Sequence, residues 1–564
     1  MADVKWTILL YLSGDNNLSP DMVRTINDIA AAGIPEDVAL AIQFDPSSPA
    51  LPTLRYIIPP KNRLSTKLNV DGSVPLPSRA VPVKRAENAA SPAVLKDFIV
   101  ESLTELKKSG VIGRRRLLVL SGHGSGAIGD FLTDDHVPKR QLHSLSIPFL
   151  GEALSNAKRE LADPETVEFA KEVPLFHVLG MDSCLMNMAE VCDEVRYSRL
   201  KGETDVSNRL VNCLVGSEGF VPRAGWPYGF LFQQIQKRTP VTSEEMSRCI
   251  VRDYVAFYRN YLAADVSVDI AACELRKLDG VVKALCGLTS LLGEHLDDRA
   301  IQDLVILSHW KAQSFKFEQY TDLWDFCDRL REAAEDSFKR FHDHNNALRD
   351  ASLTLSIEHQ KLLDKSVDLV SKCAHKLDAL TKISARAQEV CQAIEDVTRR
   401  DEKDRDQSTQ GSAGVEFQHA HGVSVYFPWQ LPATPKELSD HAGTQFADLN
   451  QYKKLRFAEN SGWGAFLEKY LGATMRPPRK TPNGKTIATL IAGIARQLGT
   501  PLRKIAGDDN RIAGDDNRIA GDDNRFLIQM FGGRMPWSMK NPPQQVEIEV
   551  PAEAHTGAGQ ESGA

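Results

Sequence analysis

The sequence lacks several features that would place it in a special class of protein. Its nine cysteines form no Cys-x-x-Cys pair, and 68 basic against 75 acidic residues give a formal net charge of −7. These features argue against a zinc ribbon, a disulfide framework and a polybasic surface for nucleic acid or anionic lipid. The apolar run Trp6–Leu12 is too short to span a bilayer and has no basic region before it. We therefore predict a cytoplasmic protein with neither nucleic-acid nor membrane partners.

Proline and glycine are missing from long stretches in the second half of the chain. No proline occurs from 241 to 427 and no glycine from 294 to 410, although average usage would place roughly ten prolines in a stretch of the first length. Because these two residues are the strongest helix breakers, residues 320–400 are predicted to be mostly helical. The apolar residues at helical spacing from Leu323 to Leu330 are expected to pack in a core rather than bind a cofactor.

Short apolar runs alternate with longer amphipathic segments over the first 217 residues, a pattern that predicts an α/β fold with a mostly parallel sheet flanked by helices. Most runs are nearly continuous in Val, Ile, Leu and Phe, as strands buried on both faces require. The Pro-rich segment 59–92 is predicted to be an exposed loop. The predicted strands are Val4–Leu12, Val38–Phe44, Leu54–Ile58, Arg116–Ser121, Leu175–Met181 and Val211–Val215.

The turn after the fourth apolar run contains Gly124, Gly126 and Gly129 at the spacing of a dinucleotide-binding fingerprint. Three acids between 130 and 135 stand where a pyrophosphate would need the positive end of a helix, which argues against that interpretation. The glycines instead favour a sharp turn that exposes His123 at the carboxyl end of a strand, where open α/β sheets bind ligands. A histidine that only bonds to a backbone carbonyl is the alternative.

Cys184 follows the fifth apolar run. Residues beyond it recur at helical spacing, so Cys184 is predicted to lie at or next to a helix N-terminus, where the partial positive charge favours the nucleophilic thiolate. The other cysteines are expected to be small buried apolar residues. The residues at helical spacing are Leu185, Met188, Ala189, Cys192 and Val195.

Cys184 and His123 follow strands of the same predicted sheet and can therefore meet at one edge. That is the arrangement of a Cys/His dyad, in which the imidazole acts as acid and base. The backbone N–H groups of Gly124 and Cys184 could form an oxyanion hole.

Six segments, in this order along the chain, resemble the motifs of the clostripain family of cysteine peptidases, which is grouped with caspases, legumains and gingipains. The resemblance covers about residues 5–470 and implies a caspase-like sheet, protein or peptide substrates, and His123 and Cys184 as the catalytic pair. The segments are Trp6–Leu18, Leu117–Gly126, Asp182–Met186, Gly216–Glu218 with Gly225–Tyr228, Tyr320–Leu323, and Gly422–Pro428.

The resemblance implies cleavage after Arg, sometimes Lys, with the acid two residues before the nucleophile in the specificity pocket. Asp182 occupies that position, and a carboxylate is the group that best compensates a partly desolvated guanidinium. Glu218 is either a second wall of the pocket or a surface acid. Asp15, Asn16 and Asn17 are expected to order the loop after the first strand rather than to bind a ligand.

Calcium is implied as an activator, not as a cofactor of the chemistry, and no metal ligands are assigned. Self-cleavage at a basic residue between the histidine and the cysteine is also implied. Lys139 and Arg140 are the candidate site, and Lys158–Arg159 is a second basic pair in the interval. Because no secretion signal precedes the domain, we expect an intracellular protease regulated by an activating protease or another partner.

Four segments are predicted: a caspase-like catalytic core at 1–280, a mostly helical segment at 281–410, the C-terminal part of the peptidase domain at 411–472, and a poorly ordered tail at 473–564. The tail carries IAGDDNR three times in tandem, and the spacing of its acids does not match an EF-hand loop. Two rival hypotheses remain. One is an inactive caspase-like scaffold, and the other is a metal hydrolase using His419 and His421, which lack a convincing third ligand.

Overall fold

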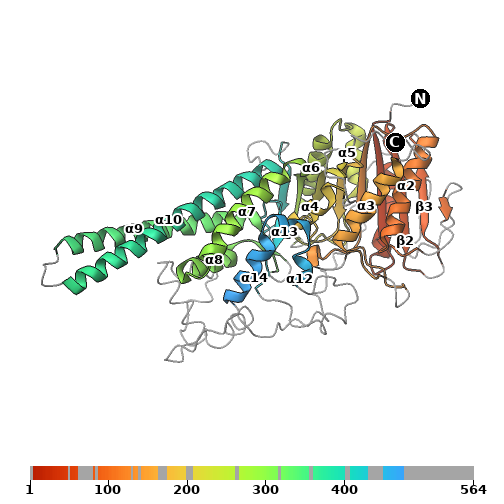
Figure 1. The fold of residues 1–564 in the computed structure, drawn as a ribbon. Coiled ribbons are helices and arrows are strands. Elements are labelled where there is room, and N and C mark those ends of the chain that lie inside the picture. The colour runs from red at the N-terminus through yellow and green to blue at the C-terminus, as the bar shows by residue number, and fades with distance from the viewer. Residues whose placement is uncertain are drawn as a thin grey trace, which may run out of the picture.

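A computed structural model gives the fold of the chain (Figure 1). It describes residues 4–48, 51–60, 80–82, 87–128, 131–137, 142–162, 174–198, 208–260, 266–315, 319–354, 360–399, 407–429 and 449–474. The tandem repeat lies outside the described residues, as does nearly all of the tail expected from residue 473 onward.

A nine-stranded sheet forms the centre of the described structure, in the order β11-β8-β7-β6-β5-β1-β2-β3-β4. The five strands from β7 to β2 run parallel, and antiparallel strands flank them on both sides. This confirms the α/β class with a mostly parallel sheet. The strands are β1 (Trp6–Gly14), β2 (Val38–Pro46), β3 (Leu54–Ile58), β4 (Ala80–Pro82), β5 (Arg115–Ser121), β6 (Phe176–Asp182), β7 (Val211–Gly216), β8 (Val268–Glu274) and β11 (Gln410–Ala413).

Two details of the edge beyond β2 differ from the sequence prediction. β3 pairs antiparallel with β2, because residues 47–53 are too few for the crossover that joins parallel neighbours. β4 lies within the segment 59–92 that was expected to be only loop, where it pairs with β3 at the sheet edge, and proline is tolerated in edge strands. Residues 61–79 and 83–86 of that segment lie outside the described residues.

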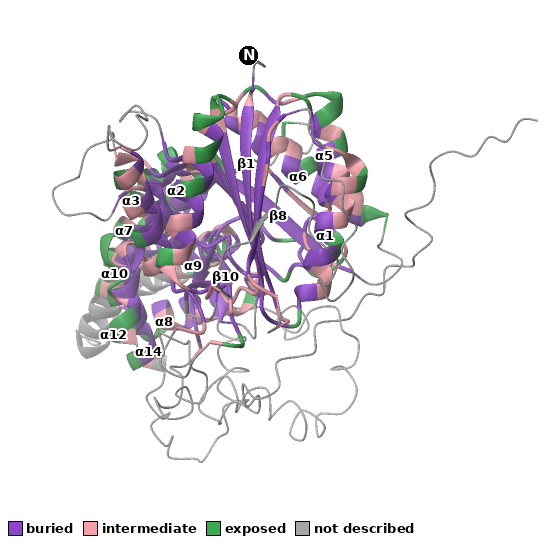
Figure 2. Ribbon diagram, turned by 90° about the vertical axis from the view of Figure 1, so that its right-hand side faces the viewer, coloured by how far each residue is buried: buried purple, intermediate pink, exposed green. Residues whose placement is uncertain are grey.

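Helices cover both faces of the sheet (Figure 2). One face is covered by α1, α5 and α6, and the other by α2, α3 and α4. Local sequence sets the helix ends: Thr242 accepts the N–H of Glu245 at the start of α6, and the Glu245 carboxylate accepts the N–H of Val241. The helices are α1 (Ser19–Ala32), α2 (Pro92–Lys108), α3 (Ile147–Leu161), α4 (Ala189–Arg196), α5 (Tyr228–Lys237) and α6 (Ser243–Arg259).

Two long helices, α9 (Leu323–Thr354) and α10 (Gln360–Val397), pair and project away from the sheet (Figure 1). They confirm the predicted helix, and the apolar residues from Leu323 to Leu330 are buried as expected. The division of the chain into domains stays a prediction. The remaining elements are α7 (Leu278–His295), α8 (Arg299–Lys311), α12 (Leu449–Tyr452), α13 (Arg456–Asn460) and α14 (Trp463–Thr474), and a small sheet of β9 (Ser314–Phe315), β10 (Tyr320–Asp322) and β12 (Ser424–Tyr426).

β12 lies within the motif Gly422–Pro428. None of the described helices is long and apolar enough to cross a membrane.

A buried glutamate ties α4 to the C-terminal segment. The Glu190 side chain has no exposed surface, and its Oε1 accepts the Tyr426 N–H at 2.8 Å and the Tyr452 hydroxyl at 2.6 Å. Burial raises the pKa of Glu190 to about 7 in spite of these bonds. The folded protein therefore holds a proton that the unfolded chain releases near pH 4.5, so this group costs stability as the pH rises through about 7.

Replacing this carboxyl with an amide should remove that pH dependence. For Glu190→Gln, the free energy of unfolding relative to the parent protein is expected to increase by about 3 kcal/mol between pH 4.5 and pH 8. Urea unfolding at both pH values measures this difference, with Glu389→Gln on the exposed face of α10 as the control. A parallel pH dependence in the parent protein and the Glu190 variant would contradict the account.

Candidate active site

The loops that follow β5 and β6 start side by side. These two strands are parallel neighbours, and their last paired residues are Ser121 and Asp182. His123 and Cys184 each lie two positions beyond this pair, and the N–H of Gly122 donates to the Asp182 carbonyl at 3.2 Å. The strand register therefore brings the two predicted site residues to equivalent positions at one edge of the sheet.

Gly124 allows the two loops to touch. A Cβ atom at this position would overlap the carbonyl oxygen of Cys184 and would lie 3.0 Å from Cβ of Ser183. Since real Cβ contacts are longer than this, any side chain at residue 124 would push the histidine loop away from the cysteine loop. The contact between the loops thus depends on glycine for steric reasons.

Cys184 does not lie at the start of a helix, so that prediction was wrong. It lies in a turn that continues through Leu185 at φ 63°, and α4 begins only at Ala189. A left-handed residue cannot start a helix, which explains why the helical spacing after Cys184 misled the prediction.

The sulfur of Cys184 has another polar partner instead. The backbone N–H of Val221, in the loop after β7, donates to Sγ at 3.3 Å. A charge-assisted bond to a thiolate is stronger than the corresponding bond to a thiol. The thiol can in turn donate to the Val221 carbonyl at 3.7 Å. The residue as a whole is 7% exposed, so these contacts lie in a largely desolvated setting.

His123 is held by a residue that the sequence analysis treated only as loop-ordering. Its Nε2 lies 2.6 Å from Oδ1 of Asn17, in the loop after β1. Because an amide oxygen only accepts, this contact keeps the proton on Nε2 and leaves Nδ1 as the basic nitrogen. Arg223 secures the same loop by donating to the Asn17 carbonyl at 2.9 Å and to Asp21 at 2.8 Å.

Asn16 orders this loop as expected. Its side chain accepts the N–H of Leu18 at 2.9 Å and donates to the Ser13 carbonyl at 3.0 Å and to the Thr133 carbonyl at 2.9 Å.

Asp182 ends β6 beneath the two loops and is 4% exposed. It accepts bonds from the Ser121 hydroxyl at 2.9 Å, the Trp226 N–H at 3.0 Å and the Tyr228 hydroxyl at 2.7 Å. Burial raises the pKa of Asp182 to about 6 although these three donors favour the charged form. In the described part of the chain, no Lys or Arg is among the groups that shift this pKa. The site therefore contains a buried carboxylate without a basic partner.

Gly225 lets the backbone approach this carboxylate. It has φ +68°, and a Cβ there would lie 2.9 Å from Oδ2 of Asp182. The loop that carries Trp226 can close over the carboxylate only because residue 225 has no side chain.

Glu218 lies deeper than the sequence analysis assumed. It has no exposed surface, its Oε2 accepts the N–H of Gly422 at 2.6 Å, and it neighbours Asp269 and Asp322. Burial is the largest cause that raises the pKa of Glu218 well above its ordinary value. This placement supports a structural role, and a contact with substrate stays a prediction without support from the described residues.

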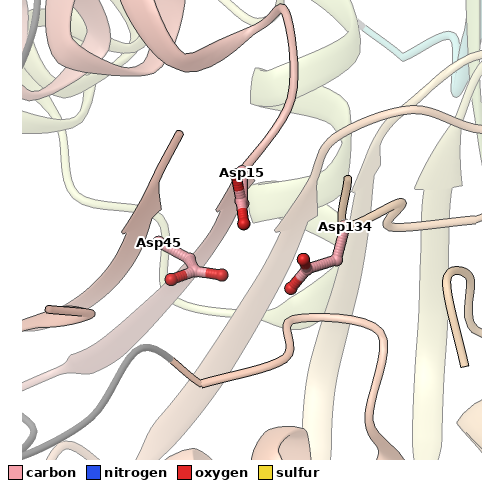
Figure 3. A group of neighbouring side chains, drawn as sticks. All are labelled: Asp15, Asp45 and Asp134. Atoms are coloured by element: carbon pink, nitrogen blue, oxygen red, sulfur yellow. The ribbon is translucent and has the colours of Figure 1, made fainter. Parts of the chain in front are cut away.

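A second group of acids lies beside the histidine loop (Figure 3). Asp15, Asp45 and Asp134 bring one carboxylate oxygen each to within 4.8 Å of the others, and all three residues are buried. Asp45 and Asp134 were not among the predicted site residues. Their positions in the sequence could have indicated the cluster, because Asp15 and Asp45 lie at the carboxyl ends of adjacent parallel strands.

The remaining predicted residues are the two basic pairs and the two histidines of the metal-hydrolase hypothesis. Lys139 and Arg140 lie outside the described residues. Lys158 and Arg159 lie within α3. His421 stacks on Trp324 at a ring distance of 3.9 Å, and neither His421 nor His419 belongs to a metal-binding group among the described residues.

None of the eight cysteines whose side chains the structure describes forms a disulfide.

A comparison with models of known protein families identifies the chain as a cysteine protease. The model of the clostripain family matches residues 11–470. The chain therefore belongs to the clostripain family of cysteine proteases and is a hydrolase. No curated protein matches the sequence significantly.

Solved structures of C11 cysteine proteases are also similar to the chain. A secreted C11 protease from Bacteroides thetaiotaomicron, in complex with an irreversible peptide inhibitor, is 14% identical with a TM-score of 0.45, over 81% of this chain and 99% of that one. An inactive zymogen of a C11 protease from Parabacteroides distasonis is 16% identical with a TM-score of 0.44, over 81% of this chain and 97% of that one.

The contact at Gly124 generates a direct test. Gly124→Ala should lower kcat/KM for peptide hydrolysis by about 100-fold, because a shift of about 1 Å between reacting groups costs that much. Gly280→Ala in α7 is the matched control, since the nearest atom to its Cβ is 4.0 Å away and alanine favours a helix. Steady-state kinetics on a fluorogenic peptide measures both variants. Full activity of Gly124→Ala would show that the two loops need not touch.

Proposed function

We propose that this protease is an endopeptidase that cleaves proteins after Arg or Lys, with Cys184 as the nucleophile and His123 as the general acid and base. The observation that carries the proposal is the close approach of Gly124 to the Cys184 carbonyl at the edge where β5 and β6 end. This approach sets the histidine loop against the cysteine loop, as nucleophilic catalysis with an adjacent base requires.

The chemistry follows from the named groups. The Cys184 thiolate attacks the carbonyl carbon of the scissile bond, and the new oxyanion is bound by the N–H groups of Gly124 and Cys184. Protonated His123 gives its proton to the leaving amine, and the C–N bond breaks to leave a thioester on Cys184. Water then attacks the thioester while His123 takes its proton, and the acid product leaves with the thiolate restored.

Two neighbours support these roles. The Val221 N–H donates to the sulfur and so favours the attacking thiolate. Asn17 fixes the Nε2 proton of His123, so Nδ1 is the nitrogen that exchanges a proton with the sulfur and the leaving amine. Asn17 is therefore proposed as a positioning residue.

Asp182 supports the preference for a basic side chain. Its carboxylate is buried without a basic partner, and the guanidinium of a substrate would supply the missing charge. The donors on Asp182 are a backbone N–H and two hydroxyls. A carboxylate has about four acceptor sites, so Asp182 can accept bonds from a guanidinium in addition to these three donors. The two hydroxyls can rotate to make room for it.

Self-processing is proposed at Lys139–Arg140 rather than at Lys158–Arg159. The second pair lies in the last turns of α3, where Lys158 Nζ donates to the Arg209 carbonyl at 2.7 Å. Helical backbone has its own hydrogen bonds satisfied and would have to unfold to enter a site for extended peptides.

A cytoplasmic location and control by a partner also remain part of the proposal. Calcium is also proposed as an activator of the enzyme.

The nucleophile test uses Cys184→Ala. Peptidase activity should fall by about 10⁴-fold or more, because loss of the nucleophile removes the covalent step, while far-ultraviolet circular dichroism stays unchanged. The variant should also remain a single chain on incubation, whereas mass spectrometry of the parent protein should find new termini at Lys139–Arg140. Cys213→Ala, which replaces a buried cysteine of β7, is the matched control. Residual activity equal to that of the control would exclude Cys184 as the nucleophile, whereas a parent protein without peptidase activity would favour an inactive scaffold.

The specificity test compares substrates with Arg and with citrulline before the scissile bond, because citrulline has nearly the same shape without the charge. The parent protein should prefer Arg by about 100-fold or more, and Asp182→Asn should lose that preference. In the protein without substrate, the pKa of Asp182 is about 6. Therefore kcat/KM for the Arg peptide should fall as the pH drops through 6 and the carboxylate is protonated. The ratio of Arg to citrulline cleavage removes contributions from the catalytic pair. An unchanged ratio in Asp182→Asn would refute the pocket assignment.

A further inference from the structure

Three carboxylates converge from three separate segments beside the proposed catalytic histidine. Asp15 directly follows β1, Asp45 lies near the end of β2, and Asp134 lies in the loop that continues from His123. Figure 3 shows the three side chains pointing toward one another, and one oxygen of each lies within 4.8 Å of the others.

The cluster has more negative charge than its surroundings balance. Asp45 is 5% exposed, and its Oδ1 accepts the Thr53 hydroxyl at 2.7 Å. Its other oxygen, Oδ2, has no hydrogen-bond partner among the described residues. An unpartnered carboxylate oxygen in a buried setting is costly unless a proton or a cation meets it.

The nearest basic group reaches only one side of the cluster. His136 Nδ1 bonds to Asp15 Oδ1. Asp134 accepts the N–H of Ala89 at 2.9 Å and of His136 at 3.3 Å. No Lys or Arg in the described segments is ion-paired to Asp45 or to Asp134.

Burial is the main cause that raises the pKa of Asp45 to about 8 and that of Asp134 to about 6. A bound divalent cation would meet the unpartnered Asp45 oxygen and compensate the buried negative charge.

We propose that Asp15, Asp45 and Asp134 bind a hard divalent cation and that this cation holds the catalytic histidine loop in place. Oxygen-only ligands select Ca²⁺ or Mg²⁺ over zinc or copper. Ligands on opposite sides of Ca²⁺ lie roughly 4.8 Å apart and those of Mg²⁺ roughly 4.2 Å apart, so the spacing admits both ions and water would complete either shell.

The effect on catalysis follows from the contacts between the two loops, and this part rests on the proposed function. The N–H of Asp135 donates to the Asp15 carbonyl at 2.8 Å, and the N–H of Leu132 donates to the His123 carbonyl at 2.9 Å. Asn17, two residues beyond Asp15, bonds to the His123 ring. A cation between Asp15 and Asp134 would thus fasten the two segments that hold both the backbone and the ring of His123.

Isothermal titration calorimetry of the Cys184→Ala protein with CaCl₂ and with MgCl₂ tests the site without self-cleavage. One site is expected, for one or both ions. Asp45→Asn and Asp134→Asn should each weaken binding by about 100-fold, at least as much as loss of an outer-sphere partner. The control is Asp303→Asn in α8, another buried acid whose pKa is raised to about 6 by burial, and it should leave binding unchanged. No heat of binding, or equal loss in the control, overturns the site.

Thermal unfolding separates a ligand from a purely structural residue. In EDTA, Asp45→Asn should unfold at or above the temperature of the parent protein, because it removes an unpartnered buried carboxyl. With saturating cation the parent protein should gain several degrees and the variant should not. A variant that is less stable in EDTA and gains equally from the cation would contradict the proposal.

Activity supplies the last readout. EDTA should lower kcat/KM of the parent protein by about 10-fold or more, the cation should restore it, and Asp45→Asn should respond to neither. Binding with unchanged activity would overturn the link to His123. If the protein binds the cation but shows no peptidase activity in any state, the proposed function fails and the cation site stands.

Discussion

The structure depends above all on the contact between the loop after β5 and the loop after β6. Parallel pairing ends at Ser121 and Asp182, so both loops start at the same point along the strand direction. Gly124 then lies directly against the carbonyl of Cys184. The register is set by two nearly fully buried strands, in which a slip of one residue would turn every side chain to the opposite face. The core of the sheet therefore places the backbones of His123 and Cys184 at one edge, whether or not their side chains bond directly.

Neighbouring strands add to this edge in turn. The loop after β7 brings the Val221 N–H to the sulfur, and the loop after β1 brings Asn17 to the imidazole. Arg223 joins these two outer loops by donating to the Asn17 carbonyl. Beneath them Asp182 is kept as a buried acid with a raised pKa. Open α/β sheets gather ligand-binding groups in this way because the carboxyl ends of parallel strands meet at one edge. The same edge, one strand further along, collects the acids proposed to bind a cation.

Much of this arrangement could be predicted from sequence because it depends on pattern. Continuous apolar runs located the strands, and the absence of proline and glycine located α9 and α10. The antiparallel direction of β3 was missed, although its short connection to β2 is visible in the sequence and excludes a parallel crossover. The turn at Cys184 was missed because Leu185 and Met188 have the spacing of a helix yet are buried outside one. Asn17, Val221 and the cluster of Asp15, Asp45 and Asp134 depend on tertiary proximity between segments far apart in sequence, which a single sequence does not reveal.

The most direct test of the account is to find which sulfur reacts when the full chain meets an arginyl acyloxymethyl ketone, a reagent that alkylates a thiolate placed beside a bound basic residue. Peptide mapping by mass spectrometry should find the adduct on Cys184 alone among the nine cysteines, and replacement of His123 by alanine should slow its formation. Equal labelling of several cysteines, or labelling of Cys184 at the same rate without His123, would show that the two loops do not form one reactive site.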